Sequence, residues 1–340
     1  MTGDPRAAGS ERRQNAVGGG ILSERHVIAV DLGGTRIRVA LVSETGKMEA
    51  RIEAPALTAE GSKAVIRRMG ALVNQLVSDA GLALDVPIGV GSPGPLNPRT
   101  GTVLYTPNLP GWRNVPLVAW LSELTGRRVA LANDGNCGTL GEIQFGSAKG
   151  VSDLVYLALG TGVGGGIVSN GRLVDGVRGL GAEVGHFVVS IDGPRCSCGS
   201  VGCLESFTAG WAIMRDATAV ATTADGDFMT KLAGGGDIHA GIVADAARQG
   251  DPAANLILAR ASRALGAAMG AFTNLLNPSM IVFGGGLVEI GDLLIEPAKR
   301  YMMMHSFVDF RQDVTVTYSS LGHDTGIYGA AALALVEFPG

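Results

Sequence analysis

Residues 27–42, VIAVDLGGTRIRVALV, set the architecture because they fold back on themselves through a glycine turn. An apolar, β-branched run stops at DLGGT, residues 31–35, and resumes at Ile37, so two strands flank a tight turn. Backbone N–H groups in such a bend form a nest for phosphate oxygens. Thr35 adds a hydroxyl donor and Asp31 a carboxylate for hydrated Mg²⁺. Taken alone, the segment fits an ordinary hairpin turn equally well.

A second hairpin of the same kind follows later in the chain. The strand predicted over residues 152–159 runs into GTGVGGGIV, residues 160–168, which again places a threonine, Thr161, in a glycine turn between strands. A single nest is weak evidence, whereas two at corresponding places indicate a duplicated fold that grips one polyphosphate between its halves. Periodicity further predicts helices over residues 62–80, 117–125, 208–223, 237–248, 252–276, 291–304 and 324–337.

One histidine and three of the four cysteines gather between residues 186 and 203. Two of the cysteines, Cys196 and Cys198, are too close in sequence for an unstrained disulfide, but both can face inward on a glycine-rich loop. The thiolate of Cys203 and the imidazole of His186 complete a tetrahedron, which suits Zn²⁺. Four protein ligands leave no position for water, so the predicted ion is structural. A reactive or disulfide-forming cluster is the alternative.

Three other places carry candidate chemistry. Asn133 and Asp134 follow the strand predicted over residues 128–132 and precede a helix, where Asp134 is either a general base or a helix N-cap. Asn108, in a rigid loop of residues 106–112, either contacts a hydroxylated ligand or forms a turn. The strand over 279–283 ends in three glycines, where a flat ring such as adenine can approach the backbone or the chain simply turns. Cys137 fits no ligand spacing and is predicted to be a buried apolar residue.

Composition limits the classes of partner. The 340 residues suffice for two domains, and glycine contributes 52 of them, about twice its usual share. A net charge of -4 gives no case for nucleic acid or an anionic membrane, so we expect a small-molecule partner. Residues 1–25 are expected to form a disordered tail rather than a signal peptide. No apolar run reaches the length of a bilayer span, and reduced thiols indicate a cytoplasmic protein.

Six motifs taken together resemble the ROK family of sugar kinases and sugar-responsive repressors: the two glycine hairpins, the Asn133-Asp134 step, the Glu183-x-x-His186 pair, its cysteine loop and the glycine turn at 284–286. The resemblance covers about residues 27–336, and the cysteine loop is its most specific part. It implies an α/β, two-domain actin/hexokinase-like (ribonuclease H-like) fold with an interdomain cleft. The expected small domain comprises residues 26–132 plus 324–340, and the large domain comprises 133–323 with the zinc loop at 186–203.

The resemblance also implies roles for single residues. Asp134 corresponds to the general base and Asn133 to its hydrogen-bonding neighbour. His186 binds zinc through one ring nitrogen and sugar through the other. The residues expected to contact the sugar are Asn108, Asn133, Asp134, Glu183, His186 and Glu205. Those expected to hold ATP and Mg²⁺ are Asp31, Gly33, Gly34, Thr35, Thr161, Gly162, Gly284, Gly285 and Gly286.

The implied activity is an ATP-dependent hexose kinase that phosphorylates the primary 6-hydroxyl of a sugar, with glucose as the first expectation because the loop at 109–112 is similar to the glucokinase version. N-acetylmannosamine and other N-acylhexosamines come next, and fructose or allose after them. Polyphosphate stays open as a donor. A ROK transcriptional regulator is the alternative of another class, but 25 polar, glycine-rich residues are too few for a helix-turn-helix domain. The family suggests a homodimer or homotetramer.

Overall fold

The first predicted hairpin begins a mixed sheet. The structure, a computed structural model, describes residues 24–339 except 84, 107–108, 222 and 224–226. Strands β1 (His26–Leu32), β2 (Arg36–Ser43) and β3 (Met48–Pro55) are antiparallel neighbours, while β4 (Ile88–Ser92) and β8 (Val129–Asn133) continue the sheet in parallel, in the order β3-β2-β1-β4-β8. The register places Asp31 opposite Arg38.

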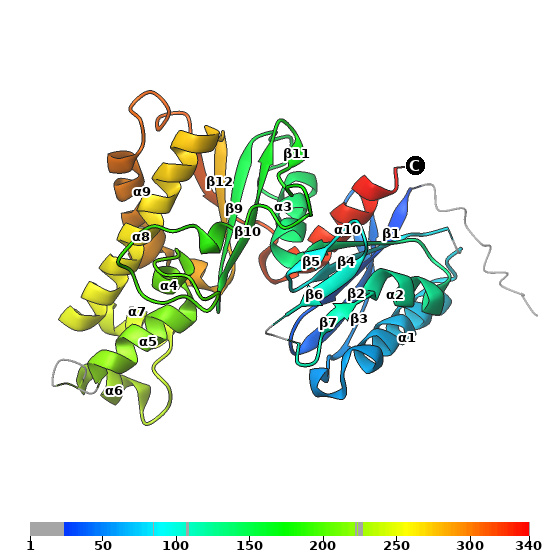
Figure 1. Cartoon of the computed structure of the whole chain (residues 1–340), viewed down its shortest axis with the longest axis horizontal. Helices are drawn as coiled ribbons and strands as arrows, with labels where there is room; N and C mark the ends of the chain where they lie inside the picture. The colour runs from blue at the N-terminus through cyan, green and yellow to red at the C-terminus, as the bar shows by residue number, and fades with distance from the viewer. Residues whose placement is uncertain (1–23, 84, 107–108, 222, 224–226, 340) are drawn as a thin grey trace, which may run out of the picture.

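Helices cover both faces of this sheet (Figure 1). Alternate apolar residues of β1 and β2 point to opposite faces, as the two-residue period of a strand requires. One set packs with α1 (Ser62–Ala80) and α2 (Leu117–Thr125), and the other with α10 (Thr325–Glu337) from the far end of the chain. Both α1 and α2 run over the predicted residues and end at a glycine in the left-handed conformation.

The second sheet repeats the arrangement of the first. Its hairpin of β9 (Leu154–Leu159) and β10 (Val163–Ser169) extends antiparallel to β11 (Arg172–Leu173) and parallel to β12 (Met280–Gly284) and β13 (Thr315–Tyr318). The order β11-β10-β9-β12-β13 therefore matches that of the first sheet in strand sense as well as in sequence order. The duplication inferred from the two glycine hairpins is confirmed.

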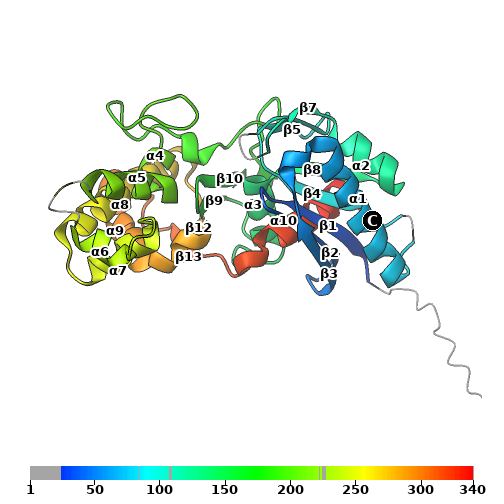
Figure 2. The same ribbon diagram turned by 90° about the horizontal axis from the view of Figure 1, so that it is seen from below.

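A helical layer packs on one face of the second sheet (Figures 1 and 2). Its long member, α8 (Pro252–Leu276), has the predicted bounds. Its N-cap is Asp251, whose side chain accepts a hydrogen bond from the Ala254 N–H at 2.7 Å. The other helices of the layer are α4 (Glu205–Thr208), α5 (Gly210–Ala221), α6 (Asp227–Ala233), α7 (Ala240–Arg248) and α9 (Gly291–His305).

The single helix predicted over 208–223 is wrong in one respect. Helical structure begins at Glu205 but breaks at Ala209, whose backbone is extended, so that α4 and α5 are separate. The break lets the Gly210 N–H bond to the Gly160 carbonyl at 2.8 Å, an outside partner that helical periodicity does not show. The described residues also form short 3₁₀ turns at Thr58–Glu60, Val184–His186, Gly286–Ile290 and Gly322–Asp324.

A small sheet was not predicted. Strands β5 (Leu96–Asn97), β6 (Thr102–Tyr105) and β7 (Arg113–Val115) pair in the order β5-β6-β7. They are too short for an alternating pattern to show in the sequence. Buried Leu109 and Trp112 fasten the surrounding loop to the core of the first sheet.

Two helices join the lobes built on the two sheets. Helix α3 (Asp134–Gln144) starts directly at the end of β8 and packs against α10, and it also lies against β9 and β10. The two lobes lie side by side in both views (Figures 1 and 2). Domain boundaries at residues 132/133 and 323/324 stay a prediction. Among the described residues, no helix has the length and apolarity needed to cross a bilayer.

Candidate active site and metal centre

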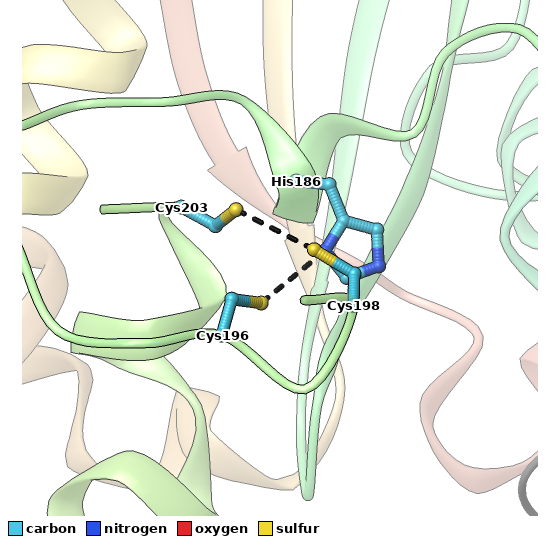
Figure 3. A group of neighbouring side chains, drawn as sticks. All are labelled: His186, Cys196, Cys198 and Cys203. Carbon is cyan, nitrogen blue, oxygen red and sulfur yellow. Dashed lines mark hydrogen bonds between the residues drawn. The ribbon is translucent and has the colours of Figure 1, made fainter. Parts of the chain in front are cut away.

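The four predicted metal ligands converge. The side-chain donor atoms of His186, Cys196, Cys198 and Cys203 lie within 4.8 Å of one another. Figure 3 shows the three sulfur atoms and one imidazole nitrogen facing a common centre. Cys196 Sγ is 3.6 Å from His186 Nδ1, and Cys198 Sγ is 3.7 Å from Cys203 Sγ. A tetrahedral Zn²⁺ with bonds of about 2.0 to 2.3 Å separates its ligands by about 3.3 to 3.8 Å, so these residues fit zinc.

The loop is shaped to keep the sulfur atoms together. The Cys196 N–H bonds to the Ser200 carbonyl at 2.9 Å, and the Gly199 N–H returns to the Cys196 carbonyl at 3.0 Å. Gly202 adopts a φ of +74°, and a Cβ there would lie 1.6 Å from the Ser190 carbonyl oxygen, so only glycine fits. The close turns are therefore fixed by backbone bonds within the loop itself.

The three thiols of the cluster differ in their pKa values. Burial, together with the adjacent thiols, raises the pKa of Cys203 to about 12, and burial raises the pKa of Cys196. Burial acts in the same direction on Cys198, but hydrogen bonds from the Ser200 backbone and the neighbouring thiols lower its pKa. Three thiolates are unfavourable at such short distances without a positive charge. A bound cation would displace the thiol protons and bind the sulfur atoms as thiolates.

Asp134 is the first residue of α3, where β8 ends. The N-cap of this helix is Asn133, whose Oδ1 accepts a hydrogen bond from the Gly135 N–H at 2.9 Å. The same N–H is 2.9 Å from Asp134 Oδ1. Asn133 therefore caps the helix, and Asp134 is not needed for that purpose.

The electrostatic setting of Asp134 suits a base. Water reaches part of the side chain, but the protein atoms around the carboxylate remove much of its hydration. This desolvation, together with the negative charges of Asp31 and Glu183, raises the pKa of Asp134 to about 6, against an opposing hydrogen bond from the Gly135 N–H. The charge of Asp31 in one lobe and that of Glu183 in the other therefore both act on the Asp134 carboxylate.

The first glycine turn carries a buried ion pair. Asp31 is only 8% exposed and is paired with Arg38, whose guanidinium also donates to the His323 carbonyl at 2.6 Å. Burial raises the pKa of Asp31, while the charge of Arg38 opposes that rise. An open pocket of about 210 Å³ borders this turn; its lining residues are Asp31, Gly33, Thr35, Arg36, Arg38, Arg51 and Glu53. The turn thus lies beside an accessible pocket and several positively charged arginine side chains.

The predicted sugar ligands lie around the metal centre. Because His186 Nδ1 faces the sulfur atoms, Nε2 is left for another partner. Burial and the charge of Glu205 raise the pKa of Glu183, and His186 lowers it, so these three residues influence one another. Glu205 is 8% exposed; its Oε1 accepts from the Ser197 hydroxyl at 2.8 Å and its Oε2 from the Val163 N–H at 3.0 Å. Asn108 lies outside the described residues.

The second glycine turn is open, while the third is partly explained by packing. Thr161 is exposed at the tip of the β9–β10 turn, beside Gly162. At the end of β12, a Cβ on Gly285 would lie 2.2 Å from the Leu159 carbonyl, and one on Gly284 would lie 2.3 Å from the Tyr156 hydroxyl. These two glycines are needed for the approach of β9. Of the three glycines at 284–286, only Gly286 has no described atom within 4 Å of a built Cβ, which leaves room for a ligand.

Two residues of the site were missed by the sequence analysis. Arg38 alternates with the buried residues Ile37 and Val39, and a charge inside an apolar strand was a usable signal for a paired carboxylate. Ser197 lies between two of the cysteines, and no sequence pattern marks its contact with Glu205.

Comparison with known proteins identifies the family of this chain. The family model described as "ROK family" matches residues 27–337. The chain is 40% identical over 308 residues to a glucokinase from Thermotoga maritima, covering 90% of this chain and 96% of that protein.

Two solved structures of ROK proteins share the fold of this chain. A ROK hexokinase from Thermus thermophilus superposes with a TM-score of 0.79 at 31% identity, covering 92% of this chain and 98% of that one. A ROK family glucokinase from Streptomyces griseus, in complex with glucose and AMPPNP, has a TM-score of 0.75 at 31% identity, with 91% and 98% covered. The predicted α/β, two-domain actin/hexokinase-like fold is confirmed, and the chain belongs to the ROK family.

Proposed function

We propose that this chain is an ATP-dependent hexose kinase that transfers the γ-phosphoryl group of ATP to the 6-hydroxyl of glucose. The observation that carries the proposal is the position of Asp134. Its carboxylate starts α3 at a strand end, has a pKa of about 6, and is electrostatically coupled to Asp31 beside one glycine turn and to Glu183 beside the metal centre. A sugar kinase requires a general base whose pKa is close to neutral pH. That base must lie between the phosphate-binding turn and the groups that bind the sugar hydroxyls.

In the proposed reaction, proton removal from the sugar accompanies transfer of the phosphoryl group. Asp134 takes the proton from the 6-hydroxyl as the sugar oxygen bonds to the γ-phosphorus. The bond from that phosphorus to the bridging oxygen breaks, and ADP leaves with the electron pair. Phosphoryl transfer needs positioning and charge stabilisation more than covalent help from the protein. The N–H groups of the two glycine turns and the hydroxyls of Thr35 and Thr161 would supply donors to the phosphates.

Magnesium would arrive with the nucleotide. Asp31 fits a water-mediated contact with Mg²⁺, because burial and the pair with Arg38 leave little of its carboxylate open for direct ligation. Bound there, Mg²⁺ would supply positive charge to the β- and γ-phosphates. Among the described residues, the one grouping of three or more metal-binding side chains close together is the zinc cluster, so ATP itself would provide the other magnesium ligands.

The zinc centre would shape the sugar pocket. With His186 Nδ1 turned to the metal, the Nε2–H is aimed as a donor to a sugar oxygen. Glu183 and Glu205, on either side of the cluster in sequence, would accept from ring hydroxyls, and Asn133 and Asn108 would complete the set. Each oxygen of Glu205 retains a second lone pair for this purpose. Similarity to the Thermotoga maritima glucokinase supports glucose over N-acetylmannosamine as the acceptor.

We also propose a homodimer or homotetramer in the cytoplasm. Large apolar side chains are exposed where α8 and α9 end, among them Leu275 at 75%, Met304 at 73% and Phe307 at 59%. The Phe307 N–H bonds to Asn274 Oδ1 at 2.7 Å, which holds these two ends together. Apolar exposure of this kind favours association, and light scattering during size-exclusion chromatography would give the subunit number.

The test measures sugar phosphate formation from glucose, fructose, allose and N-acetylmannosamine with ATP or polyphosphate as donor, and a coupled assay follows the ADP released from ATP. We expect glucose with ATP to give the highest kcat/KM. A clear preference for N-acetylmannosamine would change the substrate, and turnover with polyphosphate alone would change the donor. No sugar phosphate from any sugar with either donor would contradict the kinase itself.

A further inference from the structure

One buried carboxylate joins the zinc loop to the second glycine turn. Glu205 opens α4, two residues after the metal ligand Cys203, and is only 8% exposed. Its Oε1 accepts from the Ser197 hydroxyl at 2.8 Å, and its Oε2 accepts from the Val163 N–H at 3.0 Å. The first donor belongs to the zinc loop and the second to the turn that carries Thr161 and Gly162.

The turn is supported by the chain around Glu205 at several points. The Gly210 N–H bonds to the Gly160 carbonyl at 2.8 Å, and the Trp211 N–H bonds to the Thr161 carbonyl at 3.3 Å. At Gly162, a Cβ would lie 2.8 Å from Glu205 Oε2, so the absence of a side chain there makes room for the carboxylate. The turn therefore rests on residues 205–211, with Glu205 as its side-chain contact.

We propose that Ser197 is a positioning residue for this turn: by holding Oε1 of Glu205, it keeps Oε2 on the Val163 N–H and so fixes the donors around Thr161 and Gly162. The inference rests on the proposed function in one respect, namely that the turn binds phosphate. Ser197 itself touches neither the sugar nor the nucleotide in this account. It acts through Glu205, and it does so from between the two metal ligands Cys196 and Cys198.

Two anchors are needed because the terminal torsion of glutamate is soft. Without the Ser197 hydroxyl, Oε1 loses its donor, and its remaining neighbour in that direction is Cys196 Sγ at 3.8 Å. A metal-bound thiolate there offers no proton and repels the carboxylate. The carboxylate would then rotate to find water, and the Val163 N–H would lose its acceptor. A buried group deprived of its partner carries a cost larger than the net gain from an ordinary hydrogen bond.

The chain offers matched variants. Ser197→Ala removes the hydroxyl, and Ser197→Thr restores it; the side chain is exposed on its outer side, so both should fold. The control is Ser200→Ala, the same change in the same loop, because the Ser200 side chain makes no hydrogen bond to a described residue while its carbonyl bond to Cys196 is kept. Zinc content is measured for each variant.

The decisive readout is hydrogen exchange at the Val163 amide in the zinc-loaded protein, which needs neither sugar nor nucleotide. We expect Ser197→Ala to speed exchange there by about three- to tenfold, the equivalent of one lost hydrogen bond, with zinc content unchanged. Ser197→Thr and Ser200→Ala should exchange as the wild type does. Equal exchange in Ser197→Ala and wild type would overturn the proposal, as would loss of zinc from Ser197→Ala, which would assign the serine to metal binding.

Calorimetric titration with AMPPNP, without sugar, then links the contact to the phosphates. Ser197→Ala should bind AMPPNP about three- to tenfold more weakly than wild type and Ser200→Ala. Faster Val163 exchange with unaltered AMPPNP affinity would contradict the positioning role. Absence of AMPPNP binding by the wild type would instead contradict the proposed kinase, while the exchange measurement would still decide the contact between Ser197, Glu205 and Val163.

Discussion

Asp31 and Arg38 form an ion pair directly across two neighbouring strands, beside the first glycine turn. The pair matters because burial alone would favour the neutral carboxylic acid, and Arg38 works against that effect on the pKa of Asp31. A neutral Asp31 would contribute no charge to hydrated Mg²⁺. Under the proposed function, we expect Arg38 to keep Asp31 charged for a metal-bound nucleotide at the first turn.

Replacing Arg38 with glutamine should weaken MgATP binding by an amount that depends on pH. Without the cation, the pKa of Asp31 rises further, so more of the carboxylate is neutral at low pH and the charge returns as pH rises. We expect Arg38→Gln to raise the KM for MgATP more at pH 6 than at pH 8. Arg67→Gln is the control, because Arg67 is exposed on α1 and is not among the residues that line this pocket. A pH-independent change in KM would count against this role.

Replacing Asp134 with asparagine should stabilise the fold at neutral and higher pH. The pKa of about 6 in the folded state lies above the ordinary value of 3.8, so ionised Asp134 destabilises the native protein. This cost is absent below the ordinary value and is complete once pH has risen past the folded value. The Tm of Asp134→Asn should exceed that of wild type by up to a few degrees at pH 8 and match it near pH 4. Partial exposure keeps the gain small. A Tm difference that is the same at both pH values would contradict the linkage.

The acidic limb of the rate profile should move when Glu183 loses its charge. Activity needs deprotonated Asp134, so kcat/KM should fall as pH drops through about 6. The charge of Glu183 helps to raise that pKa, so in Glu183→Gln the limb should lie at lower pH, in addition to weaker sugar binding. Glu337→Gln, at the far end of α10, should leave the limb in place. If the acidic limb of Glu183→Gln lies at the same pH as that of wild type, Glu183 does not influence the pKa of Asp134, and the prediction is wrong.

Removing one sulfur ligand should release the metal. Cys198→Ala leaves three ligands and lowers zinc affinity, and because His186 and the loop then lose their anchor, sugar affinity should fall at least about tenfold. Metal analysis and calorimetry with glucose would measure both effects. Cys137→Ala is the control, since this buried thiol lies outside the cluster and should retain a full complement of zinc. Full zinc in Cys198→Ala would refute the assignment.

The sequence predicted elements whose signals are local. The hairpins at 31–35 and 160–164 combine β-branched runs with glycine turns, and α8 combines a cap at Asp251, a proline at its first position and a long apolar stripe. The cysteine loop was recognisable because ligand spacing is itself a local pattern. Such features need no knowledge of distant contacts.

The remaining features depend on contacts between distant segments. The break at Ala209 exists because Gly210 bonds to Gly160, and Gly285 is needed because β9 passes beside it. Glu205 accepts hydrogen bonds from the Ser197 hydroxyl and from the Val163 N–H. These contacts join three segments of the chain, and no sequence periodicity predicts them. These contacts follow from the tertiary arrangement of the two sheets.

The most direct test of the central claim compares wild type with Asp134→Asn at equal glucose occupancy, following the products of [6-¹³C]glucose and ATP by ¹³C and ³¹P NMR. The wild type should form glucose 6-phosphate and ADP, and the variant should bind glucose with similar affinity but react at least about 100-fold more slowly. Equal rates, or phosphorylation at another hydroxyl, would contradict the account.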